Sequence, residues 1–112
     1  MPQKVFIVKG DFGFEVVPAD VVVNKAEDPK VTFQNLAKND VLIEGLPQKA
    51  IEKLNPAAAP LLDYANSPTS KQKPQVTVDF SDVDDGVYTY GAIMKNLKFK
   101  AKGHSDPRII VY

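Results

Sequence analysis

Apolar and polar residues alternate with a period of two in the first and last thirds of the chain, where Val, Ile, Phe and Tyr are concentrated. This pattern favours half-buried β-strands over helices, because successive side chains of a strand point to opposite faces. The predicted strands cover residues 4–9, 14–23, 31–35, 41–44, 75–80, 87–94, 97–102 and 108–112. Pro18 interrupts the second of these strands. Since proline cannot donate to a ladder, we expect a bent strand at a sheet edge there.

Residues 46–74 depart from this alternation. Residues 47–54 begin with proline and place their apolar residues at helical spacing, which predicts one or two helical turns that end before Pro56. Residues 57–65 predict a second short helix, and residues 67–74, rich in Ser, Thr, Lys and Pro, predict an exposed loop.

Strands at both ends of the chain, with an irregular segment between them, predict an all-β fold. We expect a Greek-key antiparallel β-sandwich of about seven or eight strands, with a short helical excursion between its middle strands. The 112 residues, 44% of them hydrophobic, suffice for one core and are too few for two ordinary domains. A single domain over residues 1–112 is therefore expected.

Charge and cysteine content narrow the possible functions. The 14 basic residues balance the 14 acidic ones, so no long-range field attracts nucleic acid, and we expect no nucleic-acid partner. No apolar run reaches the roughly 18 residues of a membrane span, so none is expected. The absence of cysteine excludes disulfides, thiolate metal sites and cysteine nucleophiles.

Residues 86–92 resemble the strand that carries a copper-binding cysteine in the cupredoxins, such as plastocyanin, amicyanin and pseudoazurin. In that family the strand reads approximately Gly-x-Tyr-x-Phe/Tyr-x-Cys. Gly86, Tyr88 and Tyr90 match this pattern, and Ala92 stands at the cysteine position. The resemblance thus includes the scaffold and lacks the thiolate.

A second match lies in the first half of the chain. Cupredoxins have an aromatic residue, a nearby proline, a valine-rich strand, a Val-Thr-Phe-x-Asn strand and, after a histidine, a further valine-rich strand. Phe14, Pro18 and residues 21–23, 31–35 and 41–43 occur here in the same order at similar spacing. The resemblance therefore implies a cupredoxin-like sandwich.

The resemblance also indicates where copper ligands would lie. Blue copper requires a thiolate, two imidazoles and usually a weak thioether. The first family histidine falls on Asn39 or, with another gap, Asp40; the second falls on Lys95, and the axial methionine near Lys98 or Lys100. Lysine ammonium groups repel a metal ion. The vestigial ligand positions are therefore Asn39, Ala92 and Lys95.

Two further groups of residues have alternative interpretations. Met94 and His104 are the remaining soft ligands, but neither has the family spacing, so an edge or core methionine and an exposed turn histidine are favoured over a metal site. Asp82, Asp84 and Asp85 could supply part of a calcium shell, although an Asp-rich turn bonded to its own backbone is favoured. Residues 84–88 also resemble the tyrosine corner of immunoglobulin-type domains, which makes that fold the rival prediction.

The sequence and the resemblance together predict a metal-free cupredoxin-like module for binding or structure, without electron transfer, catalysis or cofactors. We expect a protein partner, contacted through residues 46–74 or 95–107. The alternatives are a cupredoxin-type protein with copper or another metal at a nonstandard site, and an immunoglobulin-like interaction domain. The resemblance implies an extracytoplasmic location, periplasmic or secreted.

Overall fold

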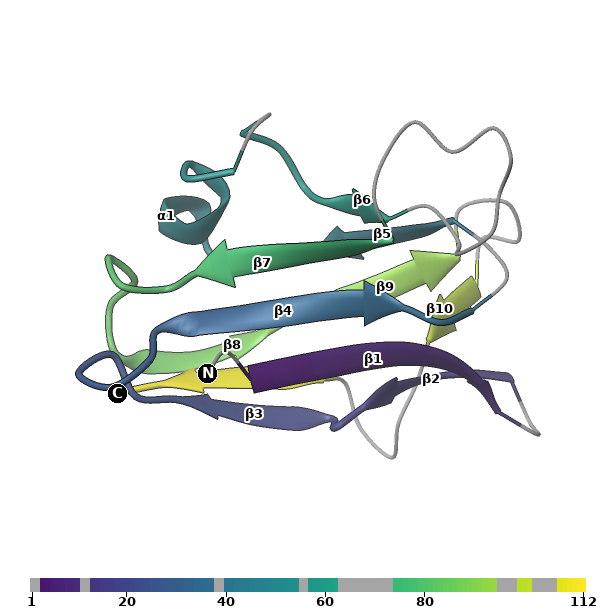
Figure 1. The fold of residues 1–112 in the computed structure, drawn as a ribbon, viewed down its shortest axis with the longest axis horizontal. Helices are drawn as coiled ribbons and strands as arrows, with labels where there is room; N and C mark the ends of the chain where they lie inside the picture. Colours follow the sequence, from purple (N-terminus) through teal and green to yellow (C-terminus); the bar gives the residue numbers. More distant parts are fainter. Residues whose placement is uncertain are drawn as a thin grey trace.

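The computed structural model describes residues 3–10, 13–37, 40–54, 57–62, 74–94, 99–101 and 107–112. These residues form a β-sandwich with one short helix (Figure 1). In chain order the elements are β1 (Gln3–Gly10), β2 (Gly13–Val17), β3 (Asp20–Val23), β4 (Lys30–Asn35), β5 (Val41–Glu44), α1 (Gln48–Ile51), β6 (Leu61–Leu62), β7 (Gln75–Asp79), β8 (Gly86–Thr89), β9 (Gly91–Met94), β10 (Phe99–Ala101) and β11 (Arg108–Val111).

One layer of the sandwich is a four-stranded sheet in the order β2-β1-β4-β7. The other layer consists of two ladders, β10-β9-β5-β6 and β3-β11-β8. Only Tyr90 separates β8 from β9. The chain therefore passes directly from the β3-β11-β8 ladder into the β10-β9-β5-β6 ladder (Figure 1). The expected all-β sandwich is confirmed, but β1 with β4 and β3 with β11 pair in parallel.

The predicted break at Pro18 is confirmed, and it moves the chain from one layer to the other. β2 before the proline is the edge strand of the first sheet, and β3 after it is the edge strand of the β3-β11-β8 ladder. An edge strand tolerates a residue without an N–H, because its outer side carries no ladder.

The segment after β5 contains one of the two predicted helices. α1 follows Pro47 as expected, and Gly45 precedes it with a φ of 85°, a conformation that favours glycine. The second predicted helix is wrong for residues 57–62, since Leu61 and Leu62 form β6 on the edge of β5. Leu62 is buried there, and tertiary pairing thus overrides a local pattern too short to distinguish helix from strand. Residues 63–73 lie outside the described part of the chain.

The core lies between the layers and consists mainly of alternating β-strand residues. In β4 the alternation turns Val31, Phe33 and Asn35 to one face, where all three are fully buried. The alternation in β3 and β11 likewise turns Val21, Val23 and Ile109 inward. Within the described ranges, no helix has the length and apolar character needed to cross a membrane.

Candidate functional site

The two ends of the sandwich differ in the elements that form them. The ligand end is formed by the last residues of β4 and by β9, where the family resemblance locates the copper site (Figure 1). The helix end lies opposite and is formed by α1, the turn of residues 80–85 and the loop of residues 24–29 (Figure 1).

Ala92 is the residue at the position to which the resemblance assigns the family cysteine. It is fully buried in β9, an interior strand of its ladder, and pairs with Ile43 of β5 on one side and Ala101 of β10 on the other. Its methyl group belongs to the hydrophobic core and has no lone pair to offer a metal ion. Ala92 therefore contributes to core packing and offers no ligand atom.

Asn35 is the buried polar residue at the ligand end. Its Oδ1 accepts a hydrogen bond from the Ala37 N–H at 2.9 Å, and its Nδ2 donates to the Leu62 carbonyl at 3.3 Å. The Asn35 N–H donates to the Pro74 carbonyl at 2.7 Å. These bonds fasten the end of β4 to β6 and to the segment that leads into β7. The amide therefore has a structural use, which the sequence alone did not reveal.

Asn39, Lys95 and His104 lie outside the described residues, as do Lys98 and most of the 95–107 loop. Met94 ends β9, where its backbone pairs with Val41.

The donor set does not fit a blue copper ion. The whole sequence has no cysteine and one histidine, whereas the centre requires a thiolate and two imidazoles. In the described ranges, moreover, no three His, Cys, Asp or Glu side chains lie together so that they could hold a metal ion.

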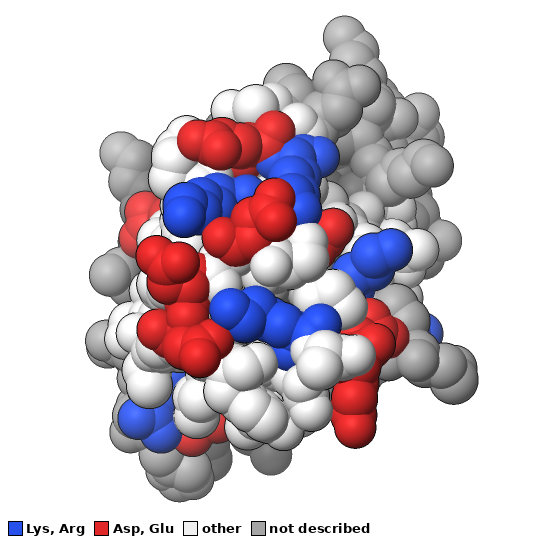
Figure 2. Space-filling view, turned by 90° about the vertical axis from the view of Figure 1, so that its left-hand side faces the viewer, with Lys and Arg blue, Asp and Glu red and all other residues white. Residues whose placement is uncertain are grey.

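The aspartates whose spacing suggested part of a calcium shell lie at the helix end and face lysines. Asp82 lies 2.9 Å from Lys53, and Asp85 lies 2.8 Å from Lys25. Figure 2 shows acidic and basic residues interspersed over this end. Hydrogen bonds from these lysines to their carboxylates raise the pKa of both Lys53 and Lys25. The pairing favours an Asp-rich structural turn over a calcium shell.

Asp79, the last residue of β7, forms a further ion pair with Lys53. Its Oδ2 lies 3.6 Å from the Lys53 ammonium, and its Oδ1 accepts a hydrogen bond from the Ser81 N–H at 2.8 Å. Partial burial opposes ionisation, yet the hydrogen bonds from Ser81 and the charge of Lys53 hold the pKa of Asp79 below its usual value. We call Lys25, Lys49, Lys53, Asp79, Asp82, Asp84 and Asp85 the charge cluster.

The hydroxyl groups of Tyr88, in β8, and Tyr90, between β8 and β9, have different hydrogen-bonding environments. The Tyr88 hydroxyl donates to the Asp84 carbonyl at 2.6 Å, which is the tyrosine-corner bond that residues 84–88 suggested. Tyr90 packs edge-on against Phe33, with ring centroids 5.4 Å apart. Its buried hydroxyl has no hydrogen-bond partner among the described residues. Burial, and then the charge of Asp20, raise the pKa of Tyr90.

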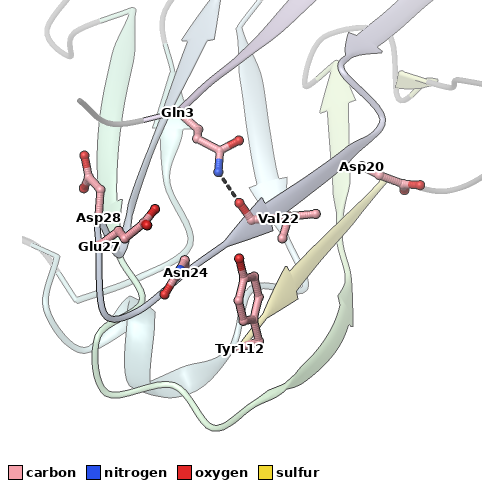
Figure 3. A pocket seen from close by; sticks show the side chains of 7 residues that line it. All are labelled: Gln3, Asp20, Val22, Asn24, Glu27, Asp28 and Tyr112. Atoms are coloured by element: carbon pink, nitrogen blue, oxygen red, sulfur yellow. Dashed lines mark hydrogen bonds between the residues drawn. The ribbon is translucent and has the colours of Figure 1, made fainter.

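A surface hollow of about 470 Å³ lies beside the outer edge of β3, away from the ligand end (Figure 3). Polar side chains supply most of its walls, and the Gln3 amide donates a hydrogen bond to the Val22 carbonyl (Figure 3). The residues that line it are Gln3, Asp20, Val22, Asn24, Glu27, Asp28 and Tyr112.

Comparison with known proteins agrees with this architecture. A purple cupredoxin from Nitrosopumilus maritimus superimposes with a TM-score of 0.54 at 15% identity, over 98% of this chain and 99% of that chain. A mutant plastocyanin of fern superimposes with a TM-score of 0.58 at 18% identity, over 98% of this chain and 100% of the plastocyanin. No protein-family model matches the sequence, and no curated protein matches it.

The chain is therefore an all-β sandwich with the cupredoxin fold, as the resemblance implied. The tyrosine corner at Tyr88 occurs within this fold, so the likeness to immunoglobulin domains is restricted to that turn. What is shared with the two superimposed proteins is the scaffold, since the sequence lacks the thiolate and the pair of imidazoles that blue copper requires.

Proposed function

We propose that this chain is a non-enzymatic binding or structural module on a cupredoxin scaffold, without copper electron transfer. The observation that carries the proposal is Ala92, a buried methyl group at the position to which the resemblance assigns the copper thiolate. A scaffold that is retained while its donors are replaced has been kept for its shape and surface.

The partner is proposed to be another protein, contacted through residues 46–74 or 95–107. Support comes from apolar residues at the ligand end. Leu36, directly after β4, is 50% exposed, and the apolar residues Ala37, Val41 and Ala92 belong to the buried core cluster. An exposed apolar side chain at this end suits protein docking. An extracytoplasmic location, periplasmic or secreted, is part of the proposal and rests on the resemblance.

The second candidate function is metal binding at a nonstandard site that includes His104 and Met94, the soft ligands that the sequence retains. Titration of the purified protein with Cu²⁺ and Ca²⁺, followed by calorimetry, separates the two candidates. We expect no saturable binding tighter than about 1 µM. Tight saturable copper binding that is lost in His104→Ala would overturn the metal-free proposal.

An Ala92→Cys variant sharpens this test. It restores the family thiol at one position while Asn39 and Lys95 remain in place of the histidines. We expect no intense visible absorption when this variant is mixed with Cu²⁺, because a blue copper centre needs the imidazoles as well. An intense band in Ala92→Cys would mean that other donors already complete the site.

A further inference from the structure

The outer face of the β3-β11-β8 ladder has more exposed apolar side chains than the rest of the described surface. Five large hydrophobic residues are exposed within the described ranges, and Val22, Val87 and Tyr112 lie on this ladder or directly after it. The other two, Val17 and Leu36, lie elsewhere. Solvent-exposed apolar side chains that gather on one face indicate an interaction surface.

Strand register aligns these side chains in a row across the ladder. Ile110 of β11 pairs with Val22 of β3 on one side and with Val87 of β8 on the other. Their chain neighbours Ile109 and Val111 are buried, so Ile110 points outward with Val22 and Val87, which are 45% and 58% exposed. We call Val22, Ile110 and Val87 the apolar row.

Polar groups flank the apolar row differently on its two sides. On one side Arg108, two residues before Ile110, forms two hydrogen bonds with Asp20 at 3.0 and 2.8 Å. On the other side Tyr112 lies two residues after Ile110, and Asp85 lies two residues before Val87. The Arg108–Asp20 ion pair thus borders one side of the row, and the Tyr112 ring with the Lys25–Asp85 ion pair borders the other.

We propose that this face binds the same face of a second copy of the chain, with the two-fold axis parallel to the apolar row. This axis places each member of the row opposite its own counterpart. It also places Arg108 over Tyr112 of the second copy, with Asp85 of that copy alongside. Cation–π attraction then accompanies the removal of apolar surface from water.

The guanidinium and the aromatic ring select this orientation and this partner. An isologous interface must be complementary to itself, because the same patch serves both subunits. A two-fold axis parallel to the strands would set Arg108 against Arg108 and leave both guanidinium groups without a ring. The axis parallel to the row sets Arg108 over Tyr112, so the groups that differ on the two sides of the row complement each other.

The proposed contact is small, since the apolar row has only one residue on each of the three strands. A standard stable interface buries about 800 Å² per partner, and smaller contacts are transient. We therefore expect a dissociation constant of about 0.1 mM. The chain is then a monomer at about 10 µM and mostly a dimer at about 1 mM.

Sedimentation velocity across this concentration range tests the proposal with Val87→Lys and a matched control, Leu36→Lys. Val87→Lys places two like charges opposite each other and is expected to weaken association at least about tenfold. Leu36 is also an exposed apolar residue, but it lies at the ligand end, so Leu36→Lys is expected to dimerise like the wild type. Val87→Thr, which keeps a β-branched side chain, should weaken association without loss of fold.

A double charge exchange, Asp20→Arg with Arg108→Asp, tests the orientation. It keeps an ion pair within the chain but sets a carboxylate over Tyr112 and Asp85 of the second copy, so weaker association is expected. A wild-type protein that stays monomeric at about 1 mM would overturn the proposal. So would equal loss of association in Leu36→Lys and Val87→Lys, or undiminished association in the double exchange. These outcomes are independent of the metal titrations.

Discussion

The two ends of the sandwich achieve order by different means. The ligand end is held by buried groups, with Ala92 packed in the core and the Asn35 amide bonded to the backbone of neighbouring segments. The helix end also packs Ala50, Phe80 and Val83 into the core, and it adds exposed groups, chiefly the charge cluster and the Tyr88 hydroxyl. Among the described residues, the ligand end thus adds a buried amide network to the common core, whereas the helix end adds exposed ion pairs.

This contrast also predicts how each end responds to perturbation. Buried hydrogen bonds in a low-dielectric interior are costly to break, because the remaining partner is left unsatisfied. Exposed ion pairs contribute little and are screened by salt. Substitutions at the ligand end should therefore cost more than substitutions at the helix end, and salt should affect the helix end alone.

The largest effect is expected at Asn35. Asn35→Ala removes the acceptor of the Ala37 N–H and the donor to the Leu62 carbonyl and leaves a small void, at an expected cost of about 3 kcal/mol in unfolding free energy. Urea denaturation measures this cost. Gln34→Ala, at the half-buried neighbouring position, serves as the control and should cost less than about 1 kcal/mol. Equal costs at the two positions would contradict the role assigned to the Asn35 amide.

An intermediate effect is expected from removing one oxygen atom at Tyr88 or Tyr90. Tyr88→Phe breaks the bond to the Asp84 carbonyl and should cost about 1 kcal/mol. Tyr90→Phe removes a buried hydroxyl without a partner among the described residues, so it should be neutral or stabilise the protein by up to about 1 kcal/mol. Thermal unfolding of the two variants beside the wild type checks the contrast, which fails if Tyr90→Phe is the more destabilising change.

Alkaline pH provides an independent test at Tyr90. Since the folded state raises the pKa of this phenol above its ordinary value of 10.0, the unfolded state loses the proton first. Stability should therefore fall as the pH rises above 10.0, and Tyr90→Phe should remove part of that fall. Identical alkaline unfolding profiles for wild type and Tyr90→Phe would contradict the burial of this hydroxyl.

The sequence predicted the features that depend on local pattern. Alternation located the residues that share one face of β4, proline located the bend between β2 and β3, and the proline-led segment after residue 46 located α1. The assignment of Ala92 to the family cysteine position also rests on the order of residues and stays a prediction. Each of these features rests on residue type and spacing along the chain.

Features that depend on distant segments could not be predicted in this way. A period of two is the same in parallel and antiparallel strands, so the parallel pairing of β1 with β4 left no signal in the sequence. Two leucines cannot reveal that β6 pairs with β5. The use of the Asn35 amide depends on Leu62, which lies 27 residues along the chain.

The smallest effect is expected in the charge cluster. Lys53→Met removes the ammonium that bridges Asp79 and Asp82 but keeps most of the aliphatic stem, so its effect on the unfolding temperature should be below that of Tyr88→Phe. Lys4→Met, outside the cluster, is the control for loss of one positive charge. High salt should abolish the difference between wild type and Lys53→Met, since it screens exposed pairs.

Acid titration tests the same pairing through Asp79. Its pKa is lowered in the folded state from the ordinary value of 3.8, so its stabilising contribution is fully present above that value and is lost as the pH falls through the folded pKa. Asp79→Asn should therefore unfold at a lower temperature than the wild type at about pH 6, and the gap should close by about pH 2. A gap that persists in acid would mean that the carboxylate acts by packing alone, and the helix end would then resemble the ligand end.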